Sequence, residues 1–111
     1  MPPWLDARIP IFVGADPAPG DAALVEEGAS PPPGVPHALF EAEMPHPAGC
    51  ACCAGRADAA LALDRLFLLR ARGEVTFFSR VAAVLATAAG EASLRAAVAS
   101  DPVVSARYRL G

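Results

Sequence analysis

The 111-residue sequence contains no lysine, asparagine or glutamine. All nine basic side chains are therefore arginines, and with twelve acidic residues the formal net charge is −3. Without a lysine amine, the chain cannot form a Schiff base, a Ser-Lys dyad or the lysine contact of a phosphate-binding P-loop. Without asparagine, it has no acceptor for N-glycosylation. Arginine in place of lysine, together with the many alanines, is typical of a GC-rich coding bias, so the absence alone indicates no function.

The sequence also lacks a basic cluster, which argues against nucleic-acid partners because such binding needs cations that displace counterions. Its longest apolar run, Val81 to Ala89, is broken by Thr87 and falls far short of the ~20 residues of a membrane-spanning helix. The N-terminus has no basic segment followed by an apolar one, so we expect no signal peptide. Three cysteines packed together are not the pattern of a secreted disulfide framework. We therefore expect a cytoplasmic protein that contacts neither membrane nor nucleic acid.

The length predicts a single domain, residues 1–111, with a modest core. Most of the twelve prolines lie within residues 10–47, whereas the larger apolar side chains gather within residues 61–85. We therefore expect a proline-rich, loop-rich half at 1–48 and a regular half at 49–111.

The first half is predicted to hold two strands and a short helix. Residues 9–14 form an apolar strand, which Pro10 places at a sheet edge or puts near the strand's own start. A helix of about two turns follows at 21–27, with Asp21 as its N-cap. After a proline-rich connector, residues 37–44 form a second strand.

The second half begins with the strongest helical signal in the chain. The helix starts at Arg56 or Asp58 and runs to about Arg72, and Gly73 ends it. Acidic residues in the first turn and basic residues in the last turn match the helix dipole. The leucines and phenylalanines of this helix form a wide cluster, so we expect it to be buried on more than one side.

An α/β pattern completes the chain. Residues 77–86 predict a strand covered on both faces, and Gly90 is expected to break the chain before a helix at 91–100. Asp101 and Pro102 then start a second, short helix, and the chain ends abruptly after Tyr108. The alternation predicts a small, mostly parallel sheet of about three strands with flanking helices.

A cysteine cluster is the most informative feature for function. Cys50, Cys52 and Cys53 supply three thiolates, the ligand type that Zn²⁺ and Co²⁺ accept. A tetrahedral site needs a fourth ligand, for which His46 and Glu43 are the local candidates. Two alternatives stay open. The cysteines can serve redox chemistry, since thiols just before a helix acquire a lower pKa, or they can be small buried packing residues.

The stretch of residues 49–58, Gly-Cys-Ala-Cys-Cys-Ala-Gly-Arg-Ala-Asp, resembles the GCxCC segment of the CobW family of metal-insertion GTPases. The order of helix, strand and helix after it is similar to the family's, and so is the Asp-Pro-Val-Val segment that starts at Asp101. The resemblance covers residues 49–111. It implies a three-layer, P-loop-NTPase-like α/β fold, incomplete here, and a metal-binding role for the three cysteines.

The nucleotide-binding half of that family pattern is missing. A P-loop would fall at Gly14–Ala22, where Asp21 stands in place of lysine and Ala22 in place of serine or threonine. Pro17 and Pro19 each remove a backbone N–H that could contact phosphate. Ala86 replaces an acid of the family. We therefore expect no bound nucleotide, no GTPase activity and no catalytic residue.

These observations predict a nucleotide-free CobW-like protein that binds zinc or a similar metal and acts in metal handling or regulation. Its partners would be the metal ion, a second copy of the chain, a full-length homologue or a client metalloprotein. A different class of function is a non-catalytic interaction module that dimerises through its apolar helix, with the cysteines merely inherited. A decaying gene fragment without activity is the remaining alternative.

Overall fold

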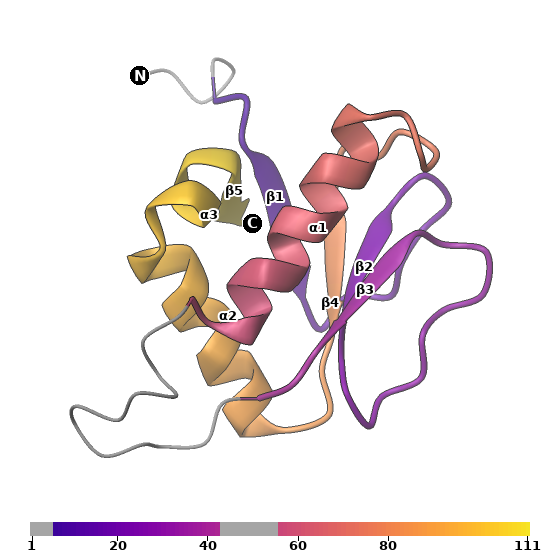
Figure 1. Ribbon diagram of the computed structural model, residues 1–111. Coiled ribbons are helices and arrows are strands. Elements are labelled where there is room, and N and C mark those ends of the chain that lie inside the picture. The colour runs from indigo at the N-terminus through magenta and orange to yellow at the C-terminus, as the bar shows by residue number, and fades with distance from the viewer. Residues whose placement is uncertain (1–5, 43–55) are drawn as a thin grey trace.

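A computed structural model of the chain describes residues 6–42 and 56–111 (Figure 1). Five parallel strands form one sheet in the order β3-β2-β4-β1-β5, and three helices pack against it. The elements are β1 Ile9–Val13, β2 Ala22–Glu26, β3 His37–Phe40, α1 Asp58–Ala71, β4 Val81–Val84, α2 Ala88–Ser100, α3 Pro102–Arg107 and β5 Tyr108–Leu110. None of these helices has the length and apolar character needed to cross a lipid bilayer.

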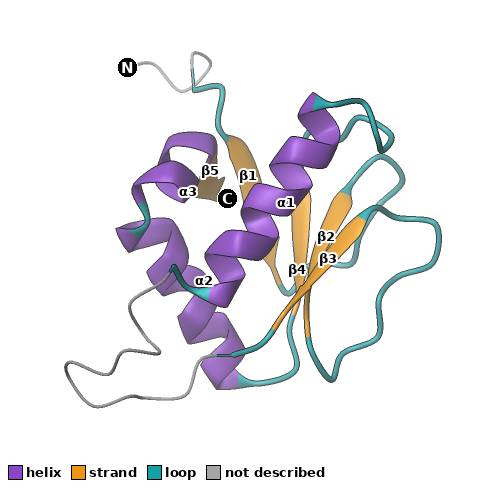
Figure 2. Ribbon diagram, viewed as in Figure 1, coloured by secondary structure: helices purple, strands orange, loops and turns teal. Residues whose placement is uncertain are grey.

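The direction of the connections explains how the sheet is covered. The helical connections from β3 to β4 and from β4 to β5 move the same way across the sheet, and α1, α2 and α3 contact one another on one face (Figure 2). The connections from β1 to β2 and from β2 to β3 move the opposite way. Parallel crossovers are almost always right-handed, so these two run over the other face. The described residues therefore form a doubly wound sheet with helices on one face and loops on the other.

The side chains of each strand point alternately to the two faces of the sheet, and this alternation decides which of them join the core. Ile9 and Ile11 of β1 and Ala22 and Leu24 of β2 point toward the helices and join one hydrophobic cluster with them. On the opposite face of β2, Ala23 and Val25 are also fully buried, although the connections there are loops. The whole of β2 is therefore shielded from water, as expected for an internal parallel strand.

The prediction of an α/β fold with a parallel sheet is confirmed, but the sheet has five strands rather than about three. The helix predicted at 21–27 is wrong, because Ala22–Glu26 is a strand that pairs with both β3 and β4. The four-residue apolar run Ala22–Val25 has no decisive helical or strand period, and here two neighbouring strands select the extended form. β3 is shorter than the predicted 37–44 and ends at Phe40.

Two further elements differ from expectation. The chain end at Tyr108 is a strand, β5, which pairs with β1 and makes β1 an internal strand. Pro10 is tolerated because the ladder with β4 begins only at Ile11. Gly90 does not break the chain but lies in the first turn of α2, which starts at Ala88 with Thr87 as its N-cap.

The helix predicted from Arg56 or Asp58 is confirmed as α1, which starts at Asp58, and Gly73 follows it with a φ of 70°. The prediction that α1 is buried on more than one side is wrong. Leu63 and Leu66 are fully buried, but Leu61 and Leu68 are 44% and 41% exposed. The short helix with an Asp101 cap and Pro102 in its first turn is also confirmed. The Asp101 carboxylate accepts hydrogen bonds from the N–H groups of Val103 and Val104.

Candidate functional site

The predicted metal ligands lie outside the described residues; they are Cys50, Cys52, Cys53, His46 and Glu43. The segment that carries them leaves the sheet after β3 and returns at the start of α1. Its two flanks are joined, because the Glu41 backbone N–H donates a 2.7 Å hydrogen bond to Asp58 Oδ2. The segment therefore begins and ends at the edge formed by the strands' carboxyl ends, where open α/β sheets bind their ligands.

Four acidic residues occupy this same edge, and we call them the acidic edge: Glu26, Glu27, Glu41 and Asp58. Glu27 follows β2, Glu41 follows β3, and both line a cavity of about 260 Å³ together with Asp58. The neighbouring carboxyl of Glu41 raises the pKa of Glu27 above its ordinary value. Within the described ranges, no three His, Cys, Asp or Glu side chains gather closely enough to hold a metal ion. Their negative charge nevertheless favours a cation at this edge.

Glu26 differs from the other three acids because it is buried and fully bonded. Only 3% of its surface is exposed. Its Oε1 accepts hydrogen bonds from the backbone N–H groups of Ala86 (2.8 Å) and Thr87 (2.9 Å), and its Oε2 accepts one from the Thr87 hydroxyl (2.6 Å). Thr87 Oγ1 in turn accepts from the Gly90 N–H at 3.0 Å and caps α2. One carboxylate thus joins the end of β2 to the start of α2.

The electrostatics of Glu26 follow from this geometry. Burial raises the pKa of the carboxyl, but the hydrogen bonds from Thr87 and Ala86 outweigh burial, and the net pKa lies below its ordinary value. A helix N-terminus is also the place where bound phosphates usually sit in folds of this class. At α2 that position holds the protein's own carboxylate, so an external anion would meet a negative charge there.

Asp21, the acid in the stretch where a P-loop would fall, has a structural role. Asp21, expected as a helix N-cap, instead precedes a strand and is 7% exposed. Its Oδ2 accepts from the Ala18 N–H at 2.9 Å, and its two oxygens accept from Arg80 Nε and Nη2 at 3.1 and 3.0 Å. The hydrogen bonds from Arg80 lower the pKa of Asp21. Because Ala22 begins a strand, this stretch presents no helix N-terminus to a phosphate.

The arginine of the cysteine-rich stretch is fixed by two acids. Arg56 Nε and Nη2 donate to the two carboxylate oxygens of Asp101 at 2.7 and 2.9 Å, and Nη1 pairs with Asp64. These bonds raise the pKa of Arg56, which keeps its charge. The pairs tie Arg56 to α1 and to the junction of α2 with α3.

Glu26 is the residue that sequence reasoning missed. The sequence feature that could have pointed to it is the position of this acid at the end of the apolar run Ala22–Val25, because a buried charge needs a partner. The partners, Ala86 and Thr87, lie about sixty positions away in sequence, so no local pattern contains them.

Comparison with known proteins found no matching family model, no similar curated protein and no similar solved structure. The resemblance to the CobW family therefore rests on the cysteine-rich stretch and the order of the elements after it.

Proposed function

We propose that the protein binds a transition metal, zinc or cobalt, through Cys50, Cys52 and Cys53, without nucleotide and without GTPase activity. His46 or Glu43 supplies the fourth ligand. The protein acts in metal handling or in the regulation of a fuller homologue, in the cytoplasm. Its partners are the metal and either a second copy or a client metalloprotein.

The observation that carries the proposal is the place where the cysteine-bearing segment joins the fold. Its flanks, Glu41 and Asp58, are hydrogen-bonded to each other at the carboxyl edge of the sheet. The acidic edge supplies negative charge around both flanks, which lowers the free energy of a nearby divalent cation and raises that of an anion. Thiolates carry negative charge themselves, so a metal ion is also what allows three of them to gather in such surroundings.

Two contacts support the part of the proposal that the protein binds no nucleotide. The Glu26 carboxylate fills the N-terminus of α2, and Asp21 is held in an ion pair with Arg80 where the family has lysine. Both place negative charge where a polyphosphate would need positive charge.

Metal analysis of the purified full chain tests the proposal directly. We expect one zinc per chain, or uptake of one Co²⁺ with the intense absorption of cobalt–thiolate bonds, at micromolar metal. Cys52→Ala should reduce the affinity at least tenfold, since a thiolate ligand is lost. Absence of metal from the purified protein, together with no cysteine-dependent Co²⁺ uptake, would contradict the proposal.

The fourth ligand is tested by comparing the two histidines. His46→Ala is expected to weaken Co²⁺ binding and shift the cobalt spectrum if His46 completes the site. His37→Ala is the matched control, because His37 is an exposed residue of β3 whose ring lies 3.3 Å from the Val35 carbonyl oxygen. If His46→Ala behaves like the control, Glu43→Gln is the variant that should weaken binding.

A second candidate, the interaction module, rests on one observation. Leu61 and Leu68 lie two turns apart on α1 and are both more than two-fifths exposed. Sedimentation of the wild type and of the Leu61→Asp/Leu68→Asp double variant, with and without chelator, separates the candidates. A dimer that survives chelator and is lost in the double variant favours the interaction module over metal binding.

A further inference from the structure

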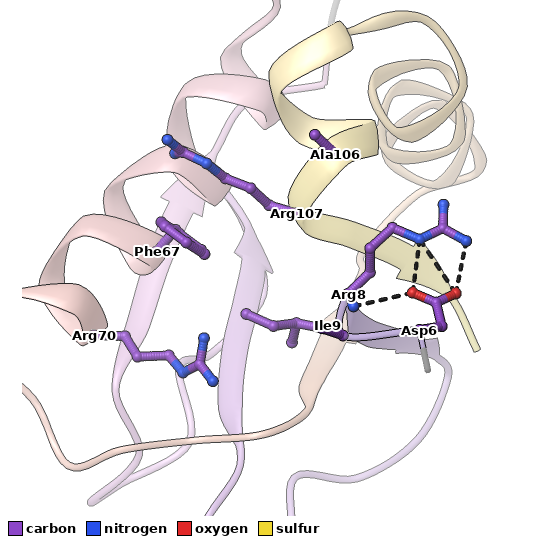
Figure 3. A pocket seen from close by; sticks show the side chains of 8 residues that line it. Asp6, Arg8, Ile9, Phe67, Arg70, Ala106 and Arg107 are labelled. Carbon is purple, nitrogen blue, oxygen red and sulfur yellow. Dashed lines mark hydrogen bonds and ion pairs between the residues drawn. The ribbon is translucent and has the colours of Figure 1, made fainter. Parts of the chain in front are cut away.

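A cavity lies at the opposite edge of the sheet, near the start of β1. It measures about 550 Å³, within the range of small-molecule sites. Its walls come from the segment before β1, the last turns of α1 and the end of α3 (Figure 3). The residues that line it include Asp6, Arg8, Ile9, Phe67, Arg70 and Arg107. Three arginines and one acid therefore surround an otherwise apolar hollow.

Two of the three arginines already have carboxylate partners. Arg8 Nε and Nη2 donate to Asp6 at 3.0 and 2.8 Å, and these hydrogen bonds lower the pKa of Asp6 to about 2. Arg107 Nη1 lies 3.8 Å from Asp64 Oδ1, and its guanidinium is stacked 4.2 Å from the centre of the Phe67 ring. Each of these two arginines therefore already faces a carboxylate, which Arg56 shares in the case of Asp64 and Arg109 in the case of Asp6.

Arg70 differs from both. Its side chain extends from the last turn of α1 toward Ile9 (Figure 3), and no carboxylate of the described residues pairs with it. Its Nε is buried and has no hydrogen-bond partner within residues 6–42 and 56–111. Its guanidinium carbon lies 4.1 Å from the Phe77 ring centre and 5.6 Å from that of Phe78, which fixes the group in place. A buried N–H donor without an acceptor costs stability, and this cost is removed if the Arg70 side chain moves toward an acceptor in the cavity.

We propose that this cavity binds a small organic carboxylate, whose two oxygens accept from the Arg70 guanidinium and whose apolar part contacts Ile9 and Phe67. The planar guanidinium matches a carboxylate with two parallel hydrogen bonds. Arg70 is the one arginine lining the cavity that pairs with no carboxylate of the described residues, and its single charge fits a monoanion. A phosphate dianion would carry a second charge close to the Asp6 carboxylate, which already pairs with Arg8 and lies 3.8 Å from Arg109, and close to the negative C-terminal end of α1.

Binding of benzoate to the full chain, followed by NMR titration and calorimetry, tests the proposal. Benzamide has nearly the same shape without the charge, and we expect it to bind at least tenfold more weakly. Phenyl phosphate, the dianion, should also bind more weakly than benzoate. Amide shifts caused by benzoate should be centred on Ile9, Phe67 and Ala106, a readout that does not depend on any variant.

Arg70→Gln should weaken benzoate binding roughly tenfold to a hundredfold, the range for hydrogen bonds to a charged group. Arg65→Gln is the matched control, since Arg65 is an exposed arginine of the same helix that does not line the cavity. The proposal is overturned if benzoate and benzamide bind the wild type equally, if phenyl phosphate binds more tightly, if the shifts centre elsewhere, or if Arg70→Gln matches the control. Metal binding by the cysteines plays no part in these measurements.

Discussion

The two edges of the sheet carry opposite charges, and they differ in whether the buried charged group has hydrogen-bond partners. At the carboxyl edge, the buried carboxylate of Glu26 has three donors and caps a helix indirectly through Thr87. At the amino edge, the guanidinium of Arg70 keeps a buried Nε without an acceptor among the described residues. A buried charged group whose hydrogen bonds are all made stabilises the fold, whereas one that lacks a partner can gain it from a ligand. We therefore assign architecture to Glu26 and ligand binding to Arg70, and we expect the carboxyl edge to attract cations and the amino edge anions.

Among substitutions of charged residues, removing the Glu26 carboxylate should cause the largest loss of stability. Glu26→Ala leaves the N–H groups of Ala86 and Thr87 without their acceptor at a buried site, and we expect the free energy of unfolding to fall by about 3 kcal/mol. Urea denaturation measures this difference. Glu27→Gln is the matched control: it removes a charge from the next residue, which is exposed and repelled by Glu41, and should leave stability unchanged or slightly higher at neutral pH.

The pH dependence of stability sharpens the same comparison. Because the pKa of Glu26 is lowered in the folded state, its contribution is complete above its unfolded value of about 4.5 and disappears as the pH falls through its lower folded value. The effect of Glu27 on stability is opposite. Because its pKa is raised in the folded state, its ionisation destabilises the fold at pH values above its unfolded pKa. Urea midpoints measured across the acid range should therefore fall less steeply for Glu26→Gln than for the wild type. Equal slopes would contradict the assigned role of Glu26.

Gly90→Ala should cost about 2 kcal/mol, although alanine is the better helix former. A Cβ at this position would lie 1.9 Å from Glu26 Oε1, so the carboxylate would have to move and break its hydrogen bonds. The same substitution made in the Glu26→Ala background should be neutral or stabilising, because the clash is gone and only the helix preference remains. A penalty of the same size in both backgrounds would show that Glu26 is not the cause.

Breaking the Asp21–Arg80 pair should have a smaller effect, about 1 kcal/mol for Asp21→Asn, because the Arg80 side chain is 47% exposed and water screens the pair. Asp16→Asn, an exposed acid in the same loop, serves as the control and should not change the thermal midpoint. If the two variants behave alike, Asp21 contributes no more than an ordinary surface acid.

The smallest effect is expected on the outer side of α1. Leu61→Ala and Leu68→Ala each remove a side chain that is more than two-fifths exposed, and we expect less than about 1 kcal/mol in the isolated chain. Leu63→Ala on the buried side is the comparison variant and should cost about 3 kcal/mol. A large loss at Leu61 or Leu68 in concentrated protein, absent on dilution, would reveal a dimer interface.

The parts of the fold that could be predicted from sequence are those set by nearest neighbours. Asp58 lies in the first turn of α1 and Gly73 follows its last turn, and Asp101 caps α3 with Pro102 in its first turn; such signals act within one turn and can be seen in the local sequence. β2 could not be assigned from its own five residues, since its extended form depends on β3 and β4.

The same distinction holds for the candidate sites. The cysteines are visible as a local cluster, and so the metal hypothesis could be stated from sequence, together with its possible fourth ligands. Glu26 and Arg70 look like ordinary charged residues at the end of a strand and a helix. What sets them apart is a set of contacts, or the lack of one, made with segments distant in the chain.

The hydrogen bond between Glu41 and Asp58 has a consequence for how the protein can be altered. It brings the two ends of residues 42–57 together, and the entropy cost of closing such a stretch grows only slowly with its length, by about 0.6 kcal/mol for each doubling. We therefore expect a change in the length of this stretch to alter the free energy of unfolding by less than the loss of the Glu26 carboxylate, which lies outside it.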